Sequence, residues 1–253
     1  MGDIHGNYRG LLQCLEKSNF DYDNDKLIQL GDVVDGWSES CECVTELLKI
    51  KNLISIKGNH DDAFNEWLVK GIHPFHWQQG AAATAASYIR YAGRECKIIP
   101  NMGAYLTDLT FADIPPTHQK FFNSQLLYYI DSENRCFVHG GFNRHFSIKD
   151  QSVPYIFYWD RNLWMQAMSY KGITVGPGET ELSFKIKDKF KEVYIGHTAT
   201  INWGKVIPMQ AANIWNLDTG SGFKGKLTIM NIDTKEYWQS DFADFLYPNE
   251  KGR

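Results

Sequence analysis

Five short motifs that combine glycine with aspartate, histidine or asparagine recur along this sequence. They are GDIHGN at residues 2–7, GDVVDG at 31–36, GNHD at 58–61, HGG at 139–141 and GHT at 196–198. Each of the last four follows a short apolar run that is typical of a buried strand. Because the carboxyl ends of neighbouring parallel strands meet at one edge of a sheet, we expect the polar side chains of these motifs to converge there.

The segments between the motifs alternate between strand and helix patterns. Helices are predicted over residues 11–15 (behind the N-cap residue Asn7), 44–50, 60–92 and 160–170. Strands are predicted over residues 26–30, 53–57, 126–130, 135–138, 193–195, 214–217, 226–232 and 236–240, and an exposed loop over 172–181. The early strand–helix–strand order predicts a parallel sheet with crossover helices. No repeat or linker divides the sequence, so a single domain over residues 1–253 is expected.

Composition and charge exclude several classes of protein. The net charge of −4 lacks the basic excess of a protein that binds nucleic-acid backbones. Every apolar run falls far short of the about 20 residues that a membrane span requires. The five cysteines are scattered and odd in number, which favours reduced thiols. With no signal-like start, these features predict a cytoplasmic protein with no nucleic-acid or membrane partner.

The side chains of the motifs suit a particular kind of metal site. Asp3 and His5 are two residues apart, so in an extended segment both can point toward one ion. Carboxylates mixed with imidazoles and an amide oxygen fit Mn²⁺, Fe or Zn²⁺ better than a metal that prefers thiolates, and Mn²⁺ is the expected ion. Two such ions about 3.5–4 Å apart would activate a water and neutralise phosphoryl oxygens together.

In this order and spacing, the five motifs resemble those of the calcineurin-like metallophosphoesterases, especially the bacterial and phage serine/threonine protein phosphatases. Residues 218–220 (DTG) and the strand that follows them extend the resemblance to nearly the whole chain. The resemblance implies an α/β fold, the four-layer α-β-β-α sandwich. Two mixed β-sheets would lie face to face between helices, with a dinuclear metal site at the strand C-terminal ends.

The same resemblance implies a role for each motif residue. The implied metal ligands are Asp3 and His5 for the first ion, Asp32 as the bridge, and Asn59, His139 and His197 for the second ion. His60 would protonate the leaving alkoxide, and Asp35 would orient the ring of His60. A hydroxide that bridges the two ions would attack phosphorus in line.

Two features depart from the family pattern. Many relatives have an arginine that grips substrate phosphate where this sequence has Gly36. Arg161 resembles a second phosphate-binding arginine, although an exposed helix arginine is an equal alternative for it. Relatives also carry an apolar strand before the first motif, whereas this sequence starts at Met1, so unpaired backbone groups are expected in the sheet.

Three functions remain open at this point. The first is hydrolysis of phosphate monoesters, with phosphoserine and phosphothreonine in proteins as the substrates. The alternative is hydrolysis of diadenosine tetraphosphate or another nucleotide polyphosphate. Gly36 stands where relatives have a phosphate-binding arginine, and the eight tryptophans offer aromatic faces on which bases can stack. A non-catalytic metal-bound interaction module would be expected to lose ligands or His60, and this sequence retains them. The expected partner is a phosphorylated protein or a small phosphoester.

Overall fold

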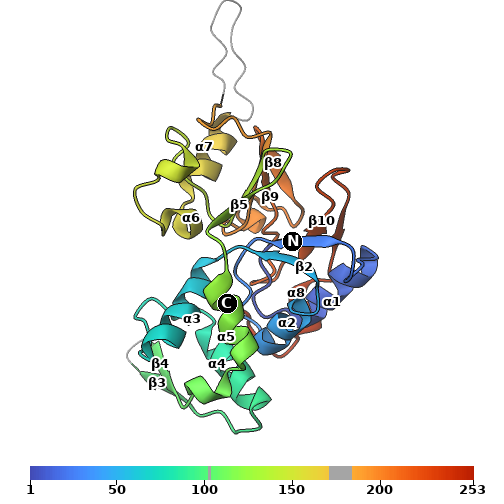
Figure 1. Cartoon of the computed structure of the whole chain (residues 1–253). Coiled ribbons are helices and arrows are strands. Elements are labelled where there is room, and N and C mark those ends of the chain that lie inside the picture. The colour runs from blue at the N-terminus through green and yellow to red at the C-terminus, as the bar shows by residue number, and fades with distance from the viewer. Residues whose placement is uncertain (102–103, 171–183) are drawn as a thin grey trace, which may run out of the picture.

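The computed structural model describes residues 1–101, 104–170 and 184–253 (Figure 1). Its largest sheet has five strands in the order β5 (Tyr128–Ile130), β6 (Arg135–Val138), β7 (Glu192–Ile195), β9 (Ile214–Asn216) and β8 (Met209–Ala211). The pairs β6–β7 and β7–β9 are parallel, and the two outer pairs are antiparallel. The predicted hairpin and the mixed character of the sheet are therefore confirmed.

A second β-layer is assembled from two strand pairs. They are the parallel pair β1 (Lys26–Gln29) and β2 (Asn52–Ser55), and the antiparallel pair β10 (Thr228–Met230) and β11 (Tyr237–Gln239). Met1 and Gly2 lie between them: the Met1 amino group donates to Ile28 O at 2.8 Å, and Gly2 N donates to Thr228 O at 3.0 Å. Unpaired backbone groups were expected in this layer, and the first two residues pair with one backbone carbonyl on each side, Ile28 O and Thr228 O.

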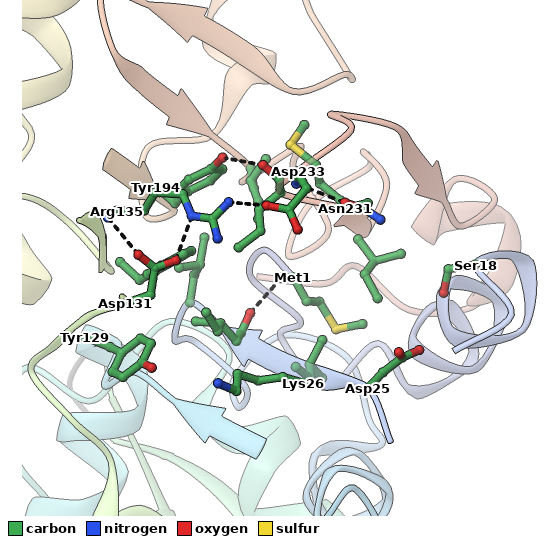
Figure 2. Close-up of a pocket in the computed structure, with 18 of the residues that line it drawn as sticks. Met1, Ser18, Asp25, Lys26, Tyr129, Asp131, Arg135, Tyr194, Asn231 and Asp233 are labelled. Atoms are coloured by element: carbon green, nitrogen blue, oxygen red, sulfur yellow. Dashed lines mark hydrogen bonds and ion pairs between the residues drawn. The ribbon is translucent and has the colours of Figure 1, made fainter. Parts of the chain in front are cut away.

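A cavity of about 400 Å³ opens beside this junction (Figure 2). Apolar side chains of β1 and β10, including Ile28 and Met230, line it together with Met1. On its rim Arg135 lies between two carboxylates, with Nε 2.6 Å from Asp131 Oδ2 and Nη1 paired with Asp233. The cavity shares no residue with the motif cluster described below.

Helices cover the outer faces of both layers (Figure 1). The second β-layer carries α1 (Tyr8–Lys17), α2 (Ser40–Leu47), α3 (Asn59–Lys70), α4 (Ala81–Tyr91), α5 (Pro116–Ser124) and α8 (Ala243–Leu246). Two helices, α6 (Ile156–Trp159) and α7 (Asn162–Tyr170), cover the five-stranded sheet. The remaining elements are the hairpin β3 (Ile98–Asn101)–β4 (Ala104–Thr107) and the 3₁₀ turns Phe111–Asp113, Ile148–Asp150 and Thr200–Trp203. Within the described ranges, no helix is both long and apolar enough to cross a membrane.

The helix predicted over residues 60–92 is in fact two helices. α3 ends at Lys70 and is capped by Gly71, whose φ of 65° is left-handed, and α4 begins after Gly80, whose φ is 77°. The residues between the two helices, 71–80, include Gly71, Pro74 and Gly80, all of which favour a break in a helix. The hairpin β3–β4 and the helix α5 had not been predicted either, and the loop predicted over residues 172–181 lies outside the described residues.

Three apolar clusters correspond to the three interfaces of a four-layer sandwich. The middle cluster joins the two β-layers and contains Leu30, Phe137, Tyr194, Leu217 and Met230. Phe137 and Tyr194 stack within it, with ring centroids 5.0 Å apart. A larger cluster lies under α1 to α5, and a third packs α6 and α7 on the five-stranded sheet. The predicted α-β-β-α sandwich is confirmed.

A candidate dinuclear metal centre

The predicted metal ligands lie where strands end. Asp32 follows β1 by three residues, His139 directly follows β6, and His197 comes two residues after β7. Asn59 and His60 begin α3, shortly after β2. All five side chains are at least nine-tenths buried, so strands far apart in sequence deliver polar groups into one confined space.

Asp32 lies at the centre of this cluster. Its Oδ2 is 3.2 Å from His139 Nε2 and 3.6 Å from His5 Nε2, while its Oδ1 accepts the backbone N–H of His60 at 2.9 Å. Two groups of potential ligand atoms, each within 4.8 Å of one another, share this carboxylate: His5–Asp32–His60 and Asp32–His139–His197. One carboxylate that belongs to two ligand groups is the arrangement that two neighbouring cations require.

Asp3 and Asn59 complete the cluster on opposite sides. Asp3 Oδ2 is 3.9 Å from His5 Nε2 and accepts the backbone N–H of His197 at 3.0 Å. Asn59 Oδ1 is 3.3 Å from His139 Nε2. A Cβ at Gly196 would lie 2.0 Å from Asp3 Oδ1, so only glycine allows this carboxylate to approach so closely.

Backbone carbonyls fix the orientation of two imidazoles. Nδ1 of His5 is 2.7 Å from Asp35 O, and Nδ1 of His139 is 2.7 Å from Leu30 O. A carbonyl can only accept, so each Nδ1 carries a proton, and in the neutral ring each Nε2 presents its lone pair to the cluster. This is the tautomer that a histidine needs in order to bind a metal.

Burial and mutual repulsion perturb the protonation of the cluster. Burial and then Asp218 raise the pKa of Asp3 well above its usual value. Burial alone would lower the pKa of His139, but Asp32 and Asp3 raise it to about 9. Burial and then His139 lower the pKa of His197 well below its usual value. These shifts oppose one another because burial disfavours every charged form while carboxylates and imidazoles lie close enough to attract or repel one another.

Several buried polar atoms of the cluster lack partners within the described part of the chain. Asp3 Oδ1 and both ring nitrogens of His197 make no hydrogen bond. Buried polar groups are normally satisfied, so unpaired oxygen and nitrogen atoms among potential metal ligands fit a bound cation. The residues present therefore fit a pair of divalent ions.

The backbone at the cluster is strained. His5, Asp32, Asp35 and His197 have φ values of 54°, 55°, 67° and 64°, in the left-handed region that residues other than glycine seldom adopt. Strain of this kind costs about 1–3 kcal/mol per residue and concentrates at functional sites. It aims the four side chains into the cluster, and no sequence pattern had marked it.

His60 and Asp35 form a buried pair at the edge of the cluster. His60 Nδ1 is 2.8 Å from Asp35 Oδ2, and the His60 and His5 rings meet edge to face at 5.1 Å. The Asp35 carboxylate also accepts Trp77 Nε1 at 3.0 Å and Thr84 Oγ1 at 2.7 Å. The sequence had predicted the His60–Asp35 pair, but nothing local marks Trp77 and Thr84 as its supports.

Two arginines border the cluster. Arg161 precedes α7, and its Nη1 donates to His197 O at 2.7 Å and to Thr198 Oγ1 at 3.1 Å, as expected for a residue near the site. Arg253, which no motif of the sequence marks, has Nη1 2.9 Å from His5 Nε2. Gly36 has a φ of 132°, and a Cβ there would lie 2.9 Å from His5 O, so the backbone itself disfavours any side chain at this position.

Ligand groups on both sides of one buried carboxylate, at the strand ends of an α-β-β-α sandwich, define a two-metal phosphoesterase. The sequence profile of the calcineurin-like phosphoesterases matches residues 1–200, and the chain belongs to this family. It is therefore a metallophosphoesterase, a hydrolase of a family whose members use a dinuclear metal centre.

Known relatives agree with this assignment. Serine/threonine-protein phosphatase 2 of Salmonella typhimurium strain LT2 is 42% identical over 80 residues, which cover 28% of this chain and 36% of that protein. Among solved structures, a protein provisionally named a diadenosine tetraphosphatase superposes with a TM-score of 0.59 at 16% identity, covering 94% of this chain and 90% of its own. A serine/threonine phosphatase from Saccharomyces cerevisiae superposes with a TM-score of 0.53 at 15% identity, covering 95% and 78%. These two superpositions establish the fold alone.

Proposed function

We propose that this metallophosphoesterase hydrolyses phosphate monoesters and that its substrates are proteins phosphorylated on serine or threonine. The observation that carries the proposal is the His60–Asp35 pair at 2.8 Å, next to the carboxylate shared by two ligand groups. A serine or threonine alkoxide is a poor leaving group that needs a proton, and a held imidazole can deliver one. The 80-residue similarity to a serine/threonine-protein phosphatase supports this choice.

We assign each residue of the cluster to one task. Asp3, His5 and Asp32 hold one divalent ion, and Asp32, Asn59, His139 and His197 hold the other, with Mn²⁺ preferred to Fe or Zn²⁺. When bound, the two ions supply an activated water and neutralise charge on the phosphoryl group. Arg161 holds a phosphate oxygen from the rim of the site.

The roles of His60 and Asp35 follow from their geometry. Asp35 accepts the proton on His60 Nδ1 and so leaves Nε2 as the ring nitrogen that gives a proton to the departing oxygen. Trp77 and Thr84 hold the carboxylate of Asp35 in place. The ring of His60 therefore keeps one orientation through the reaction, which is what general-acid catalysis requires.

Hydrolysis of diadenosine tetraphosphate or a related nucleotide is the second candidate. The observation in its favour is Trp159, which is 44% exposed and whose ring lies edge-on to that of His197, with centroids 5.9 Å apart. An exposed indole beside a phosphate site can stack on a base. Trp159→Ala would then impair nucleotide hydrolysis much more than phosphopeptide hydrolysis.

The deciding experiment compares substrates on the Mn²⁺-loaded enzyme. We expect turnover of p-nitrophenyl phosphate and of a phosphothreonine peptide, and a loss of several orders of magnitude in Asp32→Asn and His60→Asn. Good turnover of diadenosine tetraphosphate without turnover of any phosphopeptide would refute the protein phosphatase assignment in favour of the second candidate. Equal activity of wild type and Asp32→Asn would refute the proposed metal chemistry itself.

A further inference from the structure

The guanidinium of Arg253 lies among the predicted metal ligands. Its Nη1 is 2.9 Å from His5 Nε2 and 3.7 Å from Asp32 Oδ2, and the side chain is only 10% exposed. The guanidinium carbon lies 4.8 Å from the ring centroid of Phe223. Arg253 Nε, a strong donor, has no hydrogen-bond partner among the described residues.

The chain around Arg253 is anchored to the loop that follows Asp35. Glu250 accepts both Ser38 N at 3.0 Å and Ser38 Oγ at 2.7 Å. Tyr247 stacks on the buried ring of Trp37, with centroids 5.0 Å apart. Arg253 N itself donates to Gly222 O at 2.9 Å. These contacts hold the backbone of Arg253 beside the site and leave the long side chain to reorient.

A bound metal ion and this position of Arg253 exclude each other. The Nε2 lone pair of His5 either accepts an N–H from Arg253 or coordinates a cation. A divalent ion on His5 and Asp32 also repels a guanidinium at these distances. When the metal site fills, the guanidinium therefore leaves the ligand atoms while its backbone stays anchored.

A pocket next to the cluster can receive the displaced guanidinium. It has a volume of about 640 Å³, and Arg161, His197, Phe223 and Arg253 are among the residues that line it. Burial and then Arg253 lower the pKa of Arg161, because two like charges approach one another there. Two cations that face one pocket are stabilised by an anion between them.

We propose that Arg253 turns from His5 and Asp32 into this pocket and joins Arg161 in a two-arginine subsite for the phosphoryl oxygens of the substrate. Arg253 borders the position of Gly36, because a Cβ at position 36 would be in van der Waals contact with Arg253 Cβ, at 3.7 Å. Arg253, which lies 217 residues after Gly36 in the chain, would thus bind phosphate next to the position of Gly36. The proposal rests on the proposed function, because it concerns the same phosphate monoester.

The test measures binding of inorganic phosphate to the full-length, Mn²⁺-loaded protein by calorimetry, beside KM and kcat for p-nitrophenyl phosphate. Losing one charge-assisted donor pair should weaken phosphate binding by about ten- to a hundredfold in Arg253→Ala and raise KM more than it lowers kcat. Arg253→Lys keeps the charge without the planar fork and should fall in between. Lys251→Ala, at an exposed neighbouring position, is the matched control and should match wild type.

A metal titration separates the proposal from its simplest rival, in which Arg253 merely neutralises the metal-free site. In that case Arg253→Ala would bind Mn²⁺ more tightly while its phosphate affinity and KM equal those of wild type, and the proposal would be wrong. Absence of phosphate binding by the loaded wild type would overturn it as well. If phosphopeptides are not hydrolysed but Arg253→Ala still weakens phosphate binding, the subsite stands and only the substrate assignment fails.

Discussion

Replacing Asp35 by asparagine isolates the contribution of one charge to the proposed proton transfer. The Asp35 carboxylate is fully buried and contacts three donors, His60 Nδ1 at 2.8 Å, Trp77 Nε1 at 3.0 Å and Thr84 Oγ1 at 2.7 Å. In Asp35→Asn, the amide oxygen can stay between His60 and Trp77 while the NH₂ group faces the Thr84 hydroxyl, which can rotate to accept. The hydrogen bonds can then persist, and the fold with them, while the negative charge disappears.

The expected loss follows from the difference between a charged and a neutral hydrogen bond. A charge-assisted bond contributes about 1.5–3 kcal/mol and a neutral one about 0.5–1.5 kcal/mol. Their difference, about 1–2 kcal/mol, lowers kcat by about five- to thirtyfold. KM should change little, because Asp35 reaches the substrate only through His60.

The assay is steady-state hydrolysis of p-nitrophenyl phosphate by wild type, Asp35→Asn, His60→Asn and the double variant. Since Asp35 is held to act through His60, adding Asp35→Asn to His60→Asn should have no further effect. Trp77→Phe is the matched control, because it removes another donor to the same carboxylate and leaves the contact with His60. An equal further loss in the double variant would show that Asp35 acts independently of His60 and would refute this reasoning.

Three further predictions concern metal binding and stability. Gly196→Ala places a Cβ 2.0 Å from Asp3 Oδ1 and should weaken Mn²⁺ binding in a metal titration, with folding checked by circular dichroism. Phe64→Ala removes a fully buried ring that stacks on neighbouring aromatics, so urea unfolding should show a loss of about 3–5 kcal/mol; a loss below about 1 kcal/mol would contradict the packing. Burial lowers the pKa of His118 to about 4, so between pH 6.5 and pH 4 this imidazole is protonated in the unfolded chain but neutral in the folded one. The free energy of unfolding should therefore fall by about 2 kcal/mol over that pH range. His118→Gln should flatten that pH dependence, and an unchanged slope would refute it.

Sequence patterns predicted the place of the motif residues correctly where these residues directly follow strands that the sequence also predicts. The motif residues 31–36, 58–61, 139–141 and 196–198 were expected at strand ends, and the structure brings their polar side chains within a few ångströms of Asp32. This succeeded because glycine and a ligand-type residue after an apolar strand is a local signal. The individual ligand roles, by contrast, stay predictions until a metal is bound and measured.

The sequence could not reveal contacts that join distant segments without a local pattern. Trp77 and Thr84 support Asp35 from 42 and 49 residues away, yet their surroundings look like ordinary core and helix. Arg253 reaches His5 across 248 residues. The break between α3 and α4 is different, because Gly71 and Gly80 were visible and their left-handed caps could have been anticipated.

The strain and the electrostatics of the cluster have one common explanation. His5, Asp32 and His197 adopt left-handed conformations, and lone pairs on Asp3 and His197 are buried without partners. Each feature destabilises the folded chain by itself, and burial of the carboxylates adds to this. Two divalent cations would satisfy the lone pairs and offset the repulsion at once, and a ligand that binds only the folded state stabilises it by about 2.7 kcal/mol at a hundred times its Kd. The guanidinium of Arg253, next to His5 and Asp32, provides one positive charge where the metal centre is expected. Bound ions would provide that charge instead, and Arg253 would then be available to bind phosphate.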